Sequence, residues 1–195
     1  MKHYPELDPA IIVEPDILCD GTTLNTISDS CFDFVIANHL LEHMHNPLKA
    51  FESWFRVLRP SGILYLVVPD MLRTFDVDRP LTSLEHMIGD SIEGKDRDSR
   101  LDFVHYLEWV TYVYPKFREP VPATELYEEA RRLQETNYSI HFHTFVEETL
   151  KQMLTLVEKR CRAIVVEFHN DETSNEFISI MLKTLHESEK RYSRI

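Results

Sequence analysis

The chain has 195 residues, of which 43% are hydrophobic and 28% charged, the composition of one ordinary soluble domain. Its 33 acidic and 21 basic residues give a net charge of −12, which repels phosphate backbones and disfavours general nucleic-acid binding. Three cysteines are too few for a disulfide framework or an all-cysteine zinc site, so they favour a reducing compartment. With neither a secretory signal nor an apolar run near the roughly 20 residues of a membrane helix, we expect a cytoplasmic protein without membrane contact.

The first half of the sequence predicts a strand, helix, strand unit. Residues 11–17 read as an edge strand interrupted by Pro15. Residues 32–37 (FDFVIA) and 63–68 (ILYLVV) are continuous apolar runs, typical of parallel strands covered on both faces. Between them, Asn46 and Pro47 indicate a helix start, and apolar residues recur at helical spacing from Leu48 to Leu58. The connection between the two strands should be right-handed.

The second half predicts a helical insertion over about residues 71–140, with helices at 81–92, 101–114 and 124–136. Thr144 and Glu147 have the spacing of a capping box, opening a helix that runs to residue 159. Residues 163–168 and 176–182 then read as an antiparallel hairpin. The order of elements predicts an α/β fold with a helical excursion on one side.

Polar residues follow each predicted strand of the first half. Asp20 and Gly21 follow the first, residues 38–43 the second, and residues 70–79 the third. Because ligands of open α/β sheets bind beyond the carboxyl ends of the parallel strands, we expect a shared site there. The chain has only four glycines and neither a G-x-G-x-x-G turn nor a P-loop, so a nucleotide-type ligand must be held without a glycine-rich loop.

The segment SDSCFDFVIANHLLEHMHNPLKAFESWFRVLRPSGILYLVVPD, residues 28–70, resembles the class I S-adenosylmethionine-dependent methyltransferases of the type 11 subgroup. The shared features are a turn with an F-D pair, a strand, a histidine-bearing loop, a helix, and a turn back into a strand. RTFDVDRPLTSLEHMIGD and YSIHFHTF resemble a branch associated with polysaccharide biosynthesis. The resemblance implies a Rossmann-like sheet, S-adenosylmethionine as cofactor, and a glycan or other small hydroxylated acceptor.

The same resemblance defines what we expect this chain to lack. Family members begin with a strand, a glycine-rich loop and a second strand ending in an acidic residue, and no counterpart precedes residue 3 here. We therefore expect a single truncated domain over residues 1–195, with a partial Rossmann-like sheet whose first two strands are missing. Weak or absent binding of S-adenosylmethionine by this chain alone should follow.

Site residues are assigned by matching positions to the family pattern and by residue chemistry. A hydroxyl acceptor needs a base, and imidazole titrates near neutrality. The cofactor residues are Asp20, Gly21, Asn38 and His39, and the catalytic candidates are His39, His43 and His86. The acceptor-binding candidates are Asp70, Arg73, Asp76, Arg79, His141 and His143, and no metal ligand is assigned.

Alternative interpretations use the same residues. Asp20 and Gly21 can equally form a plain turn, and Arg73, Asp76 and Arg79 a salt-bridge cluster. The chain can be a non-catalytic remnant that binds a partner chain or a second copy through its exposed sheet edge. His39-x-x-Glu42-His43 also spells an inverted zinc-protease motif, but a strand before it and Pro47 after it leave little room for the helix this motif needs.

Overall fold

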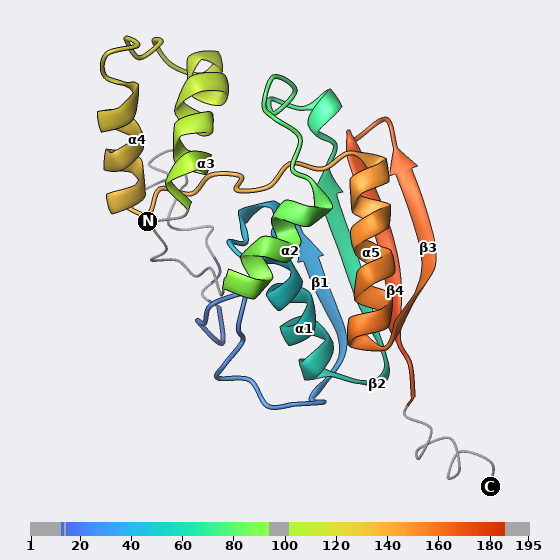
Figure 1. Cartoon of the computed structure of the whole chain (residues 1–195). Coiled ribbons are helices and arrows are strands. Elements are labelled where there is room, and N and C mark those ends of the chain that lie inside the picture. Colours follow the sequence, from blue (N-terminus) through green and yellow to red (C-terminus); the bar gives the residue numbers. More distant parts are fainter. Residues whose placement is uncertain (1–12, 14, 94–101, 186–195) are drawn as a thin grey trace, which may run out of the picture.

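The computed structural model describes residues 13, 15–93 and 102–185. Its sheet has the order β1-β2-β4-β3, in which β2 is parallel to β1 and antiparallel to β4, and β4 is antiparallel to β3 (Figure 1). The elements are β1 (Phe32–Asn38), α1 (Pro47–Val57), β2 (Leu58–Pro69), α2 (Leu84–Glu93), α3 (Phe103–Glu108), α4 (Leu126–Glu135), α5 (Glu147–Cys161), β3 (Ala163–Asp171) and β4 (Glu176–Lys183). The predicted α/β class is therefore confirmed.

The β1-α1-β2 unit forms as the sequence predicts. β1 and β2 lie side by side with Val35 opposite Leu64 and Ala37 opposite Leu66. Asn46 caps α1, because its side-chain oxygen accepts a hydrogen bond from the Lys49 backbone N–H at 2.9 Å. The predicted hairpin is also confirmed, since β3 and β4 pair antiparallel along their whole length.

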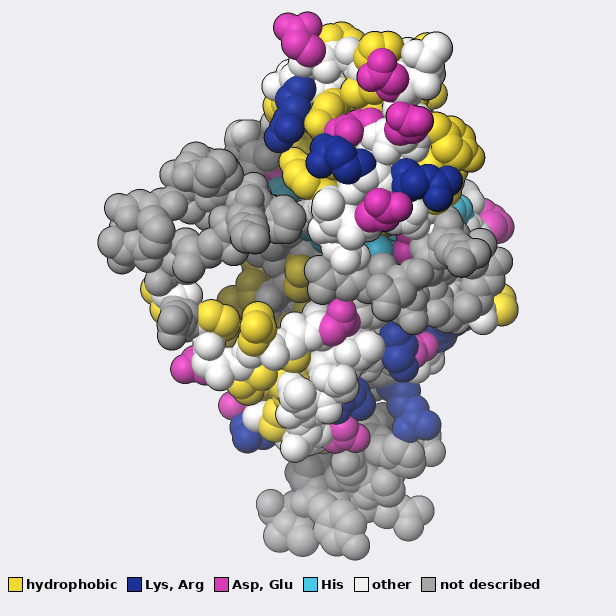
Figure 2. Space-filling model, turned by 90° about the vertical axis from the view of Figure 1, so that its left-hand side faces the viewer, with side chains coloured by type: hydrophobic (Ala, Val, Ile, Leu, Met, Phe, Trp, Pro, Cys, Tyr) yellow, Lys and Arg dark blue, Asp and Glu magenta, His cyan; other side chains and the backbone are white. Residues whose placement is uncertain are grey.

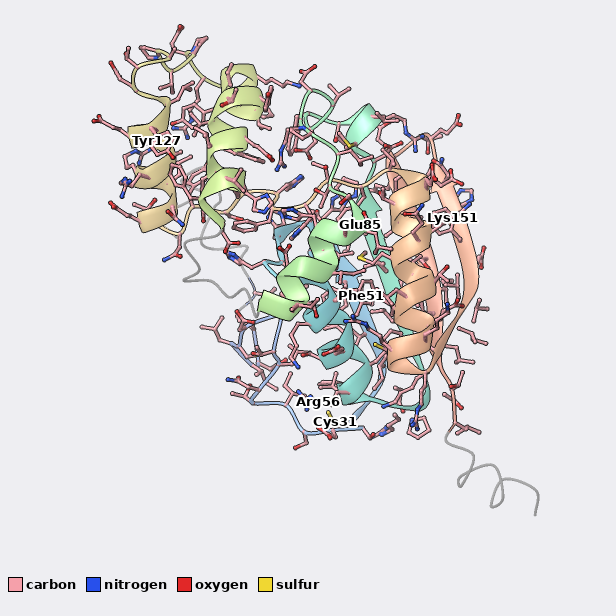
Figure 3. All side chains as sticks on the ribbon, viewed as in Figure 1. Cys31, Phe51, Arg56, Glu85, Tyr127 and Lys151 are labelled. Carbon is pink, nitrogen blue, oxygen red and sulfur yellow. The ribbon has the colours of Figure 1, made fainter. Side chains whose placement is uncertain are left out.

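Helices α1, α2 and α5 cover one face of the sheet (Figure 1). Phe51, labelled in Figure 3, and Trp54 come from the buried side of α1, and they share a core cluster with Leu66 of β2 and Met153 of α5. Burying side chains of this size stabilises the fold by roughly 1.5–3 kcal/mol each. This core fixes the positions of β1 and β2, whose carboxyl ends carry the candidate site.

The opposite face of the sheet is apolar and, in the described part of the chain, has no covering layer. Phe34 and Ile36 of β1 are 64% and 61% exposed, and their partners on β2 are Ile63 and Tyr65. Ile164 of β3 is also largely exposed. The expectation that β1 is covered on both faces is therefore wrong for the described residues: only the face that carries Val35 and Ala37 packs against helices.

A small helical part lies apart from the sheet and contains α3, a π-helical turn over Trp109–Val113, a short 3₁₀ turn over Tyr114–Lys116, and α4. Its apolar cluster joins Tyr106 and Val110 to Leu133, and Tyr127, labelled in Figure 3, packs on Phe103 with ring centroids 4.7 Å apart. On its outer surface, acidic and basic side chains alternate with apolar ones (Figure 2).

Two local predictions need correction. Helix α5 begins after Val146, whose N–H is bonded to the Thr149 hydroxyl, and Thr144 does not cap it because its hydroxyl bonds to the Pro80 carbonyl at 3.0 Å. Of the predicted strand at 11–17, residues 13 and 15–17 are not in a strand, and residues 11, 12 and 14 lie outside the described residues. Within the described ranges, no helix has the length and apolar character needed to span a membrane.

Candidate functional site

The loop that follows β1 begins with His39, whose backbone adopts the left-handed conformation (φ 48°). This turn directs the imidazole, which is 43% exposed, toward β4, where its Nε2 lies 2.6 Å from Oε1 of Glu176. Its Nδ1 lies 3.5 Å from Oε1 of Glu42. A carboxylate therefore orients the imidazole of His39 while one side of the ring remains open to solvent.

Glu42 lies inside the molecule, on a 3₁₀ turn over Leu41–His43. Its side chain is fully buried, and neither carboxylate oxygen has a hydrogen-bond partner among the described residues. Burial raises the pKa of Glu42. Its backbone carbonyl accepts hydrogen bonds from the N–H groups of Phe142 and His143, at 2.7 and 3.2 Å. The loop after β1 is thus bound to the segment that precedes α5.

His43 points into the same interior region. Its Nδ1 lies 2.8 Å from the Ile140 carbonyl, so this nitrogen carries the proton and donates, and Nε2 is the acceptor. Burial, followed by the neighbouring His141, lowers the pKa of His43 to about 4. His43 is therefore neutral at pH 7. The two rings meet edge to face with centroids 4.8 Å apart.

A cavity of about 170 Å³ opens beside His43. Two residues predicted from the sequence, Asp20 and His43, line it, and the other lining residues are Thr22, Met44, His45, Tyr106, Asn137, Tyr138, Ser139 and Phe142. Sequence reasoning missed the contributions of Tyr106 and of residues 137–139. The YSIHFHTF segment contains Tyr138 and Ser139, but only its histidines were singled out, and no signal pointed to Tyr106 or Asn137. The cavity is smaller than the roughly 300–1,000 Å³ of most small-molecule sites.

Asp20 and Gly21 form a turn that is fixed to α1. Oδ1 of Asp20 accepts hydrogen bonds from the N–H groups of Thr22 and Thr23, at 2.8 and 3.1 Å. The Gly21 carbonyl accepts a hydrogen bond from the Trp54 indole at 2.9 Å. The turn interpretation thus describes their local structure, while their role in binding a cofactor stays a prediction.

Asp76, Arg79 and His141 form a buried polar triad, in which the His141 ring contacts that of His43. The Arg79 guanidinium is fully buried, 3.0 Å from Oδ1 of Asp76 and 2.8 Å from the His141 carbonyl. Oδ2 of Asp76 lies 2.6 Å from Nδ1 of His141. Burial raises the pKa of Asp76, but the hydrogen bond from His141 and the charge of Arg79 outweigh it and lower that pKa. The three groups bond to one another, while Nε of Arg79 is buried without a hydrogen-bond partner among the described residues.

The remaining predicted residues lie in two other places. Asp70 caps a 3₁₀ turn over Met71–Arg73 and pairs with Arg73 at 2.8 Å, and Arg73 also bonds to Asn170 of β3. His86 and His143 belong to a separate cluster between α2 and α3. Asn38 ends β1 as an exposed residue and does not line the cavity. The structure thus gathers Glu42, His43, Asp76, Arg79 and His141, and places His39 beside them.

The helical geometry required by the zinc-protease interpretation does not form. His39 is in the left-handed region, and the only helical residues of the motif are the 3₁₀ turn over Leu41–His43. Glu42 lies near His39, but the three residues whose ligand atoms all lie within 4.8 Å of one another are Glu42, His43 and His141.

Three comparisons with known proteins complete the description. No curated protein matches the chain. Among solved structures, a SAM-dependent methyltransferase from Methanosarcina mazei is 21% identical with a TM-score of 0.42, the match covering 86% of this chain and 66% of that one. A second SAM-dependent methyltransferase, from Thermotoga maritima, is 12% identical with a TM-score of 0.40, and the match covers 84% of this chain and 61% of that one. The chain thus spans less than two thirds of the length of both. Residues 9–66, which include β1 and α1, match the family model described as a methyltransferase domain, and this match supports that family for the segment.

Proposed function

We propose that the chain belongs to a SAM-dependent methyltransferase that acts on a small hydroxylated acceptor such as a glycan. The observation that carries the proposal is the family match over residues 9–66, because it contains β1, α1 and the loop with His39, Glu42 and His43. That loop stands at the carboxyl end of a parallel strand, where α/β sheets bind their ligands.

His39 is the best placed group to accept a proton from an acceptor hydroxyl. Its imidazole is accessible, and Glu176 orients it and stabilises the cation that forms on proton transfer. His43, with a pKa of about 4, is a poor base at neutral pH and serves instead as a neutral hydrogen-bonding group in the cavity wall. S-adenosylmethionine supplies an activated methyl group when bound, so positioning contributes most of the remaining catalysis.

The described residues do not by themselves fit a whole S-adenosylmethionine molecule. The cavity beside Asp20 and His43 has about 170 Å³, below the usual range for such ligands. The Gly21 carbonyl accepts a hydrogen bond from the Trp54 indole, so the turn does not offer this group to an adenine ring. We therefore expect this chain alone to bind S-adenosylmethionine weakly, with a Kd on the order of 1 mM.

Nuclear magnetic resonance titration tests this proposal, because chemical shifts detect millimolar binding. S-adenosylmethionine should perturb the amides of residues 20–22 and 38–43 in the wild-type chain, and Asp20→Ala should weaken the response. The exposed-site variant Glu172→Ala, on the turn between β3 and β4, is the control and should behave like wild type. Absence of shifts at these amides, or shifts confined to other regions, would contradict the proposed site. Micromolar binding would support the family and overturn the expected weakness.

The open apolar face favours a second candidate function, a module that pairs with another copy of itself. Phe34 and Ile36 form the most exposed strip of this face, on an edge strand whose outer side has no partner in the described part of the chain. Light scattering should show an oligomer that Ile36→Lys dissociates. Leu72→Lys, at an exposed apolar residue away from the sheet face, should leave it intact. A wild-type monomer at high concentration would argue against the module.

A further inference from the structure

A second group of titratable side chains lies between α2 and α3, separate from the cavity beside Asp20. His86 and Asp90 are one turn apart on α2, His105 comes from α3, and His143 from the segment before α5. Nε2 of His86 is 3.2 Å from Nε2 of His105 and 3.5 Å from Oδ2 of Asp90. Nε2 of His143 is 2.8 Å from the same Oδ2. The three imidazoles can thus each bring one ring nitrogen within 4.8 Å of the other two, and the Asp90 carboxylate contacts two of them.

The separations are those of ligands around a tetrahedral zinc ion. With zinc–nitrogen and zinc–oxygen distances of about 2.0–2.2 Å, two ligand atoms of a tetrahedron are roughly 3.3 Å apart. The separations of His86 from His105 and of Asp90 from His86 and His143, 3.2, 3.5 and 2.8 Å, lie around that value. Three imidazoles and one carboxylate suit zinc, whereas magnesium and calcium prefer all-oxygen sites.

We propose that His86, Asp90, His105 and His143 bind one Zn²⁺ ion. Most of the proposed ligands are buried, and a cavity gives the ion access to them. Asp90, His105 and His143 are buried, and His86 is about one third exposed. A cavity of about 210 Å³, lined by Pro80, Leu81, Thr82, Ser83, His86, His105 and Glu108, leads from the surface to two of the four ligands.

The most buried ligand is oriented by its neighbour, because Oδ2 of Asp90 lies 2.8 Å from Nε2 of His143. The rings of His86, His105 and His143 also contact one another, with centroids 5.0 to 5.8 Å apart.

Four protein ligands complete a tetrahedral shell, so the site is structural rather than catalytic. The ion would join α2 and α3 to the extended segment at His143, and so attach the helical insertion to the sheet. This role does not depend on methyl transfer, and a metal-free chain could still bind S-adenosylmethionine at the carboxyl end of β1.

Metal analysis of the full chain tests the proposal. The chain is stripped with a chelator, Zn²⁺ is titrated back, and bound metal is counted by mass spectrometry against protein concentration. Cobalt(II) in place of zinc reports geometry, because a tetrahedral site gives strong visible absorption. His86→Ala removes the most exposed ligand, so it perturbs the core least. His169→Ala, an exposed histidine on β3, is the matched control, and His43→Gln reports on the neighbouring cluster.

We expect one Zn²⁺ per chain, tetrahedral cobalt spectra, and a higher unfolding midpoint with zinc than without it. His86→Ala should weaken zinc binding at least roughly tenfold, since even the loss of an outer-shell partner costs this much. His169→Ala and His43→Gln should bind as wild type does. No stoichiometric zinc, octahedral cobalt spectra, or zinc lost in His43→Gln but kept in His86→Ala would each overturn the proposal.

Discussion

Replacing Arg79 by methionine should destabilise the protein severely, although the sequence alone makes this residue look like a ligand-binding arginine. Its guanidinium is fully buried and bonds to Asp76 at 3.0 Å and to the His141 carbonyl at 2.8 Å. Methionine has similar length but leaves the Asp76 carboxylate inside the protein without its cation. Removing one partner of a buried ion pair costs about 3–5 kcal/mol, a large fraction of the 5–15 kcal/mol that stabilises a typical domain.

Urea unfolding of four chains measures this effect: wild type, Arg79→Met, Asp76→Asn, and the double variant. The double variant should lose less stability than the two single losses added together, by about 0.5–3 kcal/mol, because the second substitution removes a charge that the first left unpaired. Lys49→Met is the control. Its pair with Glu52 spans 3.4 Å between side chains that are 52% and 40% exposed, so it should cost under about 1 kcal/mol. A similarly small cost for Arg79→Met would show that the triad is hydrated and the reasoning wrong.

Three further predictions concern His43 in the loop after β1 and the contacts of α1 with the segment before β1. The pKa of His43 is lowered from 6.5 to about 4, so the stability that neutral His43 contributes is complete above pH 6.5 and is lost as pH falls toward 4. The free energy of unfolding should fall by about 3 kcal/mol over this range, and His43→Gln should remove most of this pH dependence. Arg56→Ala removes hydrogen bonds to the Leu24 and Ile27 carbonyls at 2.7 and 2.8 Å. It should lower the free energy of unfolding by about 2 kcal/mol and speed amide hydrogen exchange in residues 22–30, and unchanged exchange there would contradict this prediction. Trp54→Phe removes both the bond to the Gly21 carbonyl and part of a fully buried ring, and should cost about 2 kcal/mol or more in urea unfolding; no loss would count against a role for that bond.

The elements that local patterns define were predictable from the sequence. Asn46 and Pro47 start α1 where expected, and the β-branched runs at β1, β2 and β4 form strands. What failed depended on distant contacts. Thr144 and Glu147 have the spacing of a capping box, but the Thr144 hydroxyl finds Pro80, 64 residues away in the sequence. An apolar run likewise does not reveal whether one or two faces of its strand are covered.

The candidate site was predictable as a list of residue types but not as a set of neighbours. The sequence singled out His86, His141 and His143, yet nothing in it separates the histidine that meets Asp76 from the one that meets Asp90. His105 was missed altogether, because it lies in a helix whose apolar spacing indicates only core packing. These assignments need the path of the chain from α3 back to the sheet, which no local pattern encodes.

The path of residues 140–145 links the cluster around Asp76 and His141 to the cluster around Asp90 and His143. Residues 140–145 are buried although they form neither helix nor strand, so their backbone groups require partners. Glu42 supplies one through its carbonyl, which receives two N–H groups, and Thr82 supplies another by accepting the N–H of Thr144 at 2.9 Å. The side chains of His141 and His143 then reach Asp76 and Asp90 on either side. Because one short segment contributes to both clusters, a change that displaces His143 must also shift His141 and the wall of the cavity beside His43.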